Sequence, residues 1–271
     1  ALREGEKNKM KQTKTLRWIS VIAASLVLFT ASINMSPALA QSLAEVPGVG
    51  NMVKVLTFRG YNLEENNFKA DIKVPVIDGL EDKDLESALN AKYLDENKKL
   101  YENFMADISE LKEQYPEAHI GIDTGYIIKT DNDQIFSIGR YVLNTAGSSS
   151  TVFQYDTIDK KNQVLITLPS LFKDEQYIPA ISEYIQREMR EQVLTDATGG
   201  IMYWITGVGI EFPFDPFDRI APNQSFYINP DGKLVISFDK YEVGPGSMGV
   251  IEFVIPTEIL AQLLVSNDYL H

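Results

Sequence analysis

The sequence predicts an α+β protein in which a single transmembrane helix precedes an outer domain with an antiparallel sheet and two main helices. Three observations lead to this prediction. Residues 18–44 contain no charged side chain, short alternating segments are separated by turn residues, and two longer segments carry apolar residues at three- and four-residue steps. Strands that follow one another, with the helices set apart from them, are typical of the α+β class.

The N-terminal segment has the pattern of a membrane anchor. Residues 1–17 carry a net charge of +4, so the rest of the chain carries −17 and the whole chain −13. As a helix, residues 18–37 would span about 30 Å, the thickness of the hydrocarbon core of a bilayer. The basic flank predicts that residues 1–17 lie in the cytoplasm and that the acidic remainder lies outside.

A cleavage pattern follows the apolar segment. Ala38 and Ala40 form a small-x-small site before Gln41, and Pro37 ends the helix just ahead of them. The segment is therefore interpreted either as a signal peptide that is removed or as a permanent anchor, with residues 18–40 as the transmembrane helix. Both interpretations place the residues that follow Gln41 outside the cytoplasm.

The outer part of the chain begins with a connection, a strand and a long helix. Residues 41–66 are expected to form a juxtamembrane connection, with a short strand or helix at residues 52–58. The alternating residues 68–74 predict a strand that ends at Pro75. Residues 82–115 predict a helix with one apolar face and one charged face. Its apolar stripe consists of Leu85, Leu89, Tyr93, Leu100, Phe104, Ile108 and Leu111.

Residues 67–271 together are expected to form an extracytoplasmic ligand-binding domain. Strands separated by polar turns follow the long helix, and residues 207–223, rich in Pro, Gly and Phe, are expected to be irregular. An Asp-Gly pair at residues 231–232 predicts a hairpin turn. The expected strands are residues 120–129, 135–143, 151–155, 164–168, 226–228, 234–238 and 250–255, and the further expected helices are residues 176–195 and 257–264.

The composition excludes several classes of function. The chain has no cysteine, and its two histidines are His119 and His271, which excludes a thiolate metal site, a cysteine nucleophile and a multi-histidine metal site. The acidic balance argues against nucleic-acid binding, which requires basic patches. Residues 244–249 match the dinucleotide pattern G-x-G-x-x-G, but a strand rather than the required helix is expected after them. The sequence therefore supports no enzymatic activity, no metal and no cofactor.

Two glycine-rich segments are candidate ligand-contacting loops. Residues 146–150 and 244–249 each lie between expected strands, and small residues with a flexible backbone can enter the cleft of a partner. Pro245 would stiffen the tip of the second loop. Two ordinary hairpin connections remain the alternative interpretation of these residues.

Several segments resemble a known family. Residues 226–250 read Phe-Tyr-Ile-Asn-Pro-Asp-Gly-Lys-Leu-Val-Ile-Ser-Phe-Asp-Lys-Tyr-Glu-Val-Gly-Pro-Gly-Ser-Met-Gly-Val. This segment resembles the C-terminal domain of the membrane-bound anti-sigma-V factors of Gram-positive bacteria. Residues 75–80, 157–162 and 168–175, and the anchor with its Ala-x-Ala site, resemble the same family in the same order. The resemblance covers nearly the whole chain.

The resemblance implies a signalling mechanism at the cell membrane. A cytoplasmic N-terminal segment, expected mostly upstream of Ala1, holds an extracytoplasmic-function sigma factor inactive. The outer domain binds lysozyme, and binding allows signal peptidase to cut between Ala40 and Gln41. An intramembrane protease then cuts within about residues 19–29, inside the bilayer, and the freed sigma factor switches on genes for lysozyme resistance. The chain is thus expected to be a single-pass membrane protein with its C-terminal domain extracellular.

The resemblance also implies which residues approach the lysozyme cleft. They lie in the two glycine-rich loops, and Pro245 and Gly246 match the family pattern, whereas Ser247 stands where the family usually has Tyr. The implied ligand-contacting residues are Gly147, Ser148, Ser149, Ser150, Pro245, Gly246 and Ser247.

The charge distribution agrees with a cationic ligand such as lysozyme. The −17 carried by residues 18–271 would attract such a ligand over long range and speed its association, and salt would weaken the attraction. One alternative is a secreted or anchored accessory module that binds the cell wall or lysozyme and has no anti-sigma role. Another is an enzyme that uses two carboxylates on a glycan, which the sequence does not support.

Overall fold

The computed structural model describes residues 53–65, 67–115, 117–209 and 215–271. All of them belong to one compact unit, Pro47–His271. The expected transmembrane helix at residues 18–40 and the cleavage site around Ala40 lie outside the described residues. Within the described ranges, no helix combines the length and the hydropathy that a membrane span requires.

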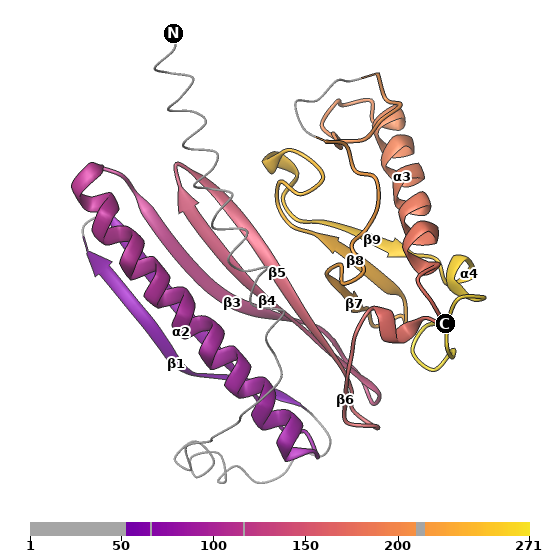
Figure 1. Ribbon diagram of the computed structural model, residues 1–271, viewed down its shortest axis with the longest axis horizontal. Coiled ribbons are helices and arrows are strands. Elements are labelled where there is room, and N and C mark those ends of the chain that lie inside the picture. The colour runs from indigo at the N-terminus through magenta and orange to yellow at the C-terminus, as the bar shows by residue number, and fades with distance from the viewer. Residues whose placement is uncertain (1–52, 66, 116, 210–214) are drawn as a thin grey trace. The chain divides into compact units, whose positions relative to one another are not determined.

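A six-stranded sheet forms the first half of the unit (Figure 1). Its strands neighbour one another in chain order, from β1 to β6. The hairpin of β4 and β5 is paired over its full length, from Ile135 opposite Asp159 to Ala146 opposite Ser148. The strands are β1 (Lys54–Glu65), β2 (Phe68–Asp78), β3 (Ile120–Asp131), β4 (Ile135–Ala146), β5 (Ser148–Asp159) and β6 (Val164–Ile166).

The sheet is antiparallel except between β2 and β3, which corrects the prediction of a purely antiparallel sheet. Phe68 lies opposite Ile120, and Asp71 lies opposite Asp123, with the two strands running the same way. Helix α2 (Lys83–Gln114) joins the two strands and returns the chain to the end at which β2 began. A crossover of this kind is what allows neighbouring strands to be parallel.

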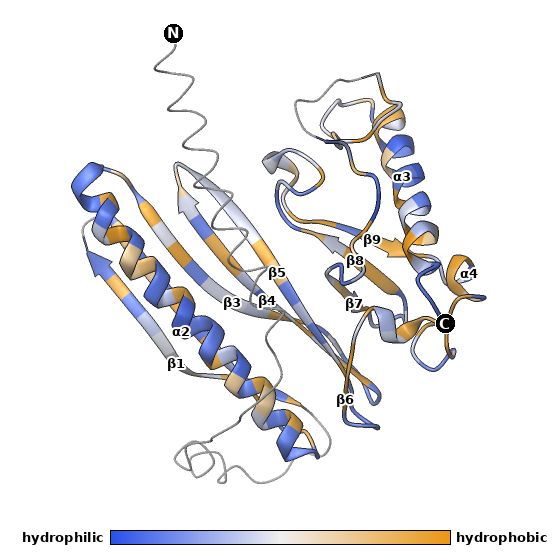
Figure 2. Cartoon of the chain, in the orientation of Figure 1, coloured by the Kyte–Doolittle hydropathy of each residue, from blue (hydrophilic) through white to orange (hydrophobic). Residues whose placement is uncertain are grey.

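Helix α2 confirms the expected helix at residues 82–115. Asp82 caps it by accepting from the backbone amides of Asp84 and Leu85 at 2.9 and 3.0 Å. The apolar stripe packs on the sheet, where the ring of Tyr93 is fully buried, and hydrophilic residues occupy the rest of the helix (Figure 2). The other stripe residues that are buried are Leu89, Phe104 and Ile108.

A cluster of charged side chains lies between α2 and the sheet. Arg140 of β4 pairs with Asp156 of β5 at 3.1 Å and with Glu96 of α2 at 2.6 Å, and its guanidinium lies 4.1 Å from the centre of the Tyr93 ring. Lys92 of α2 adds a second cation 2.8 Å from Asp156. Burial opposes the charge on Asp156, but these two cations outweigh it and lower the pKa of that carboxyl from 3.8 to about 2.

The second half of the unit contains a three-stranded antiparallel sheet, β7 (Phe226–Ile228), β8 (Leu234–Phe238) and β9 (Ile251–Ile255). Helix α3 (Tyr177–Thr195) contributes the buried residues Ile181, Ile185 and Met189 to its core and confirms the expected helix at residues 176–195. The remaining elements are the short helices η2 (Pro169–Leu171), η3 (Gly246–Met248) and α4 (Thr257–Leu260).

Polar contacts, one of them buried, join the two sheets. Thr130 of β3 donates its hydroxyl to the carbonyl oxygen of Ile228 in β7 at 2.5 Å. Lys129 of β3 pairs with Glu252 of β9 at 2.8 Å, and the hydroxyl of Tyr155 in β5 donates to the same carboxylate at 3.1 Å. The face of the sheet opposite α2 is thus bonded to the second half of the unit.

Other element boundaries also differ from the prediction, and β5 extends beyond its expected range at both ends. Strand β2 continues through Pro75, because this proline lies opposite Thr57 at an irregularity in the pairing with β1, where a missing amide donor is tolerated. Strand β1 begins within the short element expected at residues 52–58 but continues to Glu65, through the rest of the expected juxtamembrane connection. Helix α4 ends at Leu260 rather than at residue 264.

Replacing the buried arginine should weaken the fold. We expect Arg140→Met to lower the free energy of unfolding by about 3–5 kcal/mol, because it leaves the buried Asp156 with only one cation. Urea unfolding of the full chain measures this loss. The control is Arg219→Met, since the side chain of Arg219 is 73% exposed, and it should change stability by less than about 0.5 kcal/mol. Equal losses in the two variants would contradict the assigned role of the charged cluster.

Candidate ligand-binding surface

The first candidate loop is the tip of the β4–β5 hairpin. Only Gly147 lies outside the strands, with a φ of 72°, because Ser148 already pairs with Ala146. The expected loop at residues 146–150 is therefore mostly strand, and Ser149 and Ser150 lie on β5. The left-handed φ accounts for the glycine at the tip. The tip is consequently a tight turn, and the side chains of Ala146 and Ser148 on either side of Gly147 are exposed.

The second candidate loop connects β8 to β9. Residues Gly246–Met248 form one turn of 3-10 helix, and Ser247 is exposed on it. Strand β9 follows immediately, so the context required for dinucleotide binding is absent from this described segment. Gly244 is needed here because a Cβ on it would lie 2.8 Å from the carbonyl oxygen of Met202.

Three consecutive residues at the end of β8 bind the hairpin, and we call them the 239–241 clasp. Asp239 accepts from the backbone amide of Phe153 at 2.8 Å. The backbone amide of Lys240 donates to the carbonyl of Thr151 at 3.2 Å, and its ammonium donates to the hydroxyl of Ser149 at 2.8 Å.

The last clasp residue touches both candidate loops. A 2.7 Å hydrogen bond joins the hydroxyl of Tyr241 to that of Ser148 at the hairpin tip. The ring of Tyr241 packs against Gly246 so closely that a Cβ at that glycine would collide with it. The structure therefore brings the two sequence-predicted loops together, with Tyr241 between them.

Sequence analysis missed Tyr241 and its two neighbours. The motif search looked for glycine-rich segments, and residues 239–241 lie just ahead of one. An aromatic residue between a strand and a glycine-rich turn was the available signal. The bonds from this segment to residues 148–153 could not be read from the sequence, because they join positions 86–93 residues apart.

The clasp contains a carboxyl with a perturbed pKa. Burial raises the pKa of Asp239 from 3.8 to about 7, the amide of Phe153 opposes this increase, and the nearby Glu242 adds to it. Glu242 accepts from the backbone amide of Asp239 at 2.7 Å and from the carboxamide of Gln224 at 2.9 Å. The attachment of the clasp therefore includes a group that titrates near neutral pH.

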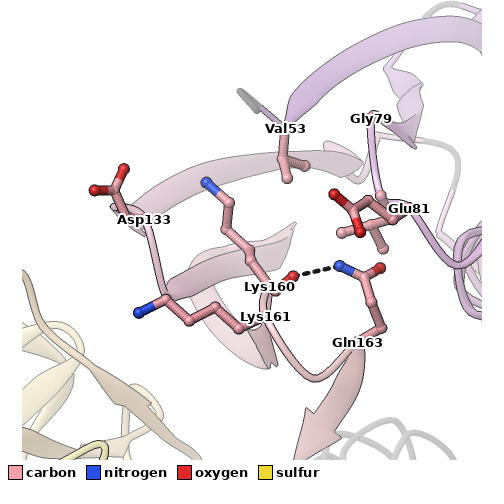
Figure 3. A pocket seen from close by; sticks show the side chains of 8 residues that line it. Val53, Gly79, Glu81, Asp133, Lys160, Lys161 and Gln163 are labelled. Atoms are coloured by element: carbon pink, nitrogen blue, oxygen red, sulfur yellow. Dashed lines mark hydrogen bonds between the residues drawn. The ribbon is translucent and has the colours of Figure 1, made fainter. Parts of the chain in front are cut away.

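A separate pocket of about 490 Å³ lies at the other end of the hairpin (Figure 3). Two of its polar side chains are bonded within the chain: Gln163 donates to the carbonyl of Lys160, and Lys160 pairs with Asp131 at 2.8 Å. The register of β1, β2 and β5 places Val53 and this pocket at the end of the sheet opposite Gly147. The lining residues are Val53, Gly79, Leu80, Glu81, Asp133, Lys160, Lys161 and Gln163.

Neither histidine lies in a site with catalytic geometry. His119 is exposed, and the ring of His271 packs beside Gly232 at the C-terminus. Among the described residues, no group of three or more His, Cys, Asp or Glu side chains is placed to hold a metal ion. The groups that the two loops bring together are hydroxyls, an ammonium and a phenol, which are suited to contact with a partner.

Comparison with known proteins identifies the family. Residues 169–258 match DUF3298, a family described as a protein of unknown function. Over 261 residues the chain is 42% identical to the anti-sigma-V factor RsiV of Bacillus subtilis (strain 168). The aligned region covers 96% of this chain and 88% of that protein. The chain belongs to the anti-sigma-V factor RsiV family. The family that was predicted from the sequence resemblance is thus confirmed.

Two crystal structures share the fold of this RsiV-family chain. A DUF3298 protein from Bacteroides fragilis matches with a TM-score of 0.55 and 14% identity, over 81% of this chain and 96% of that one. A DUF3298 protein from Pseudomonas aeruginosa matches with a TM-score of 0.52 and 12% identity, over 81% of this chain and 97% of that one. At these identities the likeness concerns the α+β fold alone.

Removing the ionisable group of the clasp should change the pH dependence of stability. Folding raises the pKa of Asp239, so this carboxyl stabilises the fold at acid pH and loses that contribution as the pH rises through about 7. Asp239→Asn keeps an oxygen that can accept from Phe153 but cannot ionise. We expect the difference in melting temperature, variant minus parent, to increase by about 2–4 °C when the pH is raised from 5 to 8.

The matched control for this experiment is Asp231→Asn, in the exposed turn between β7 and β8. Its melting temperature should follow that of the parent at every pH. Parallel pH profiles for the parent and Asp239→Asn would show that Asp239 is ionised at both pH values.

Proposed function

We propose that this chain is a membrane-anchored anti-sigma factor whose outer domain binds lysozyme and is then cleaved to release a sigma factor. The observation that carries the anti-sigma role is the 42% identity, over nearly the full length, to a protein named anti-sigma-V factor. The sigma factor is the implied cytoplasmic partner. Because this relative is named as a regulatory protein, a binding function is favoured over an enzymatic function for this chain.

The geometry of the two loops supports a protein ligand. Gly147, Ser148, Ser149 and Ser150 on one side, and Pro245, Gly246 and Ser247 on the other, are joined through Tyr241 into one surface. No carboxylate belongs to these seven positions, whereas residues 18–271 carry −17. Such a surface suits a cleft that itself contains carboxylates, as glycoside-hydrolysing enzymes have, while the acidic remainder attracts the basic exterior of lysozyme.

The N-terminal pattern supports regulated cleavage. Residues 18–40 combine the length of an anchor with the Ala38–Ala40 site of a secretory signal peptide. We propose that the bond between Ala40 and Gln41 stays intact until the outer domain binds its ligand. A second cut within the bilayer would then free the cytoplasmic part. The same Ala-x-Ala pattern favours the second candidate function, an accessory module that is secreted without signalling.

Lysozyme should bind the full chain, and a charge placed on the loop should weaken that binding. Calorimetry with hen egg-white lysozyme should show an affinity that falls as sodium chloride rises. Ser247→Glu should weaken binding by about tenfold or more, because its carboxylate would be desolvated without a partner. Ser109→Glu, on the exposed face of α2, adds the same charge and should leave the affinity within about twofold of the parent.

Two results would contradict this account. An absence of binding at low salt would remove lysozyme as the ligand. Equal effects of the two glutamate substitutions would mean that the loops do not contact it.

Cleavage in cells separates the two candidate functions. In a Gram-positive host, the chain should keep its N-terminus until lysozyme is added, and N-terminal sequencing should then find a product that begins at Gln41. If untreated cells already contain only this product, the chain is an accessory module released on export. Ala40→Trp, which removes the small residue required at the site, should prevent the product from forming.

A further inference from the structure

The backbone of Tyr241 is unusual for its residue type. Its φ is 75°, and within the described ranges the other non-glycine residue with a positive φ is Gln163. This conformation is disfavoured in a residue that carries a Cβ, and asparagine or glycine would adopt it more easily. A tyrosine here must therefore be held by its surroundings.

The surroundings that hold Tyr241 come from both candidate loops. Its hydroxyl bonds Ser148, its ring lies against Gly246, and the ammonium of Lys240 lies 5.3 Å from the ring centre. The preceding residues of the clasp are bonded to β5. The side chain therefore has a fixed orientation although it lies on the surface.

The packing of the ring does not account for its presence. Tyr241 is 40% exposed, whereas Tyr177 and Tyr203, in the core of the same half, are 2% and 5% exposed. Because the ring is only partly buried, it contributes less hydrophobic free energy than a buried tyrosine would, although the backbone at this position is strained. Strained residues that surrounding contacts hold in place are concentrated at ligand-binding sites.

We propose that Tyr241 is the aromatic ligand-contacting residue of this surface and sets its affinity for the cleft of lysozyme. This inference rests on the lysozyme-binding function proposed above and adds a residue to it. A saccharide-binding cleft offers apolar surface, and the partly exposed ring held between the two loops presents apolar area that such a surface could contact. Ser247, the exposed residue of the second loop, offers no comparable apolar area. Gly246 acts as a positioning residue, because its lack of a side chain leaves room for the ring.

Chemical modification tests the contact without any substitution. Tetranitromethane nitrates exposed tyrosines, and mass spectrometry reports each site in the full chain, alone and with saturating hen egg-white lysozyme. We expect Tyr241 to be nitrated in the free chain and protected at least about tenfold in the complex, as a buried interface residue would be. The control is Tyr115, which is 54% exposed at the end of α2 and should react equally in both samples.

Substitutions provide a second test. Tyr241→Gly should weaken lysozyme binding by about tenfold or more without lowering the melting temperature, because glycine relieves the backbone strain. Tyr241→Phe keeps the ring and loses the bond to Ser148, so it should retain affinity within about threefold, the value of one exposed hydrogen bond. Gln163→Gly, at the other left-handed residue, should leave the affinity unchanged.

The outcomes distinguish this inference from the function on which it rests. If the parent chain does not bind lysozyme, the proposed function fails and the inference fails with it. If the parent binds while Tyr241 stays reactive in the complex, or while Tyr241→Gly binds as tightly as the parent, the inference is overturned and the lysozyme-binding role stands. Protection of Tyr241 together with weaker binding of Tyr241→Gly establishes the contact.

Discussion

The β4–β5 hairpin is held on both of its faces, and this double attachment fixes the position of the candidate binding surface. Because successive side chains of a strand point to opposite faces, Asp156 meets the cations beneath α2 while Tyr155 reaches Glu252 of the second sheet. A shift of the pairing by one residue would exchange the two faces and bury the wrong side chains. The register is therefore strongly specified, and so is the position of the tip at Gly147.

In the proposed function, a firmly placed hairpin would allow such small side chains to form a specific surface. Serine and glycine bring little binding energy of their own, so their usefulness depends on being held in place before the ligand arrives. The 239–241 clasp provides this by bonding the second loop to the first along β5. Strand β5 is about 37 Å long at about 3.4 Å per residue, so a ligand on the tip lies far from Val53.

The sequence was sufficient for the elements with strong periodicity. Helices α2 and α3 and most strands begin or end within a few residues of their expected bounds, because their apolar residues repeat at the period of the element. The parallel pairing of β2 with β3 and the passage of β2 through Pro75 escaped prediction, since both depend on partners distant in the sequence. The two loops were found from their glycines, but Tyr241 was not. Its importance comes from a left-handed backbone and from contacts with Ser148 and Gly246.

In the proposed function, the two loops and the clasp act as one ligand-binding surface. Hydrogen–deuterium exchange of the full chain with and without lysozyme tests this, because it reports backbone protection in every segment at once. We expect lysozyme to slow exchange in residues 146–151 and 239–249 together and to leave α2 (Lys83–Gln114) unchanged. Protection of only one of the two loops, or protection centred on α2 or on the pocket beside Val53, would contradict it.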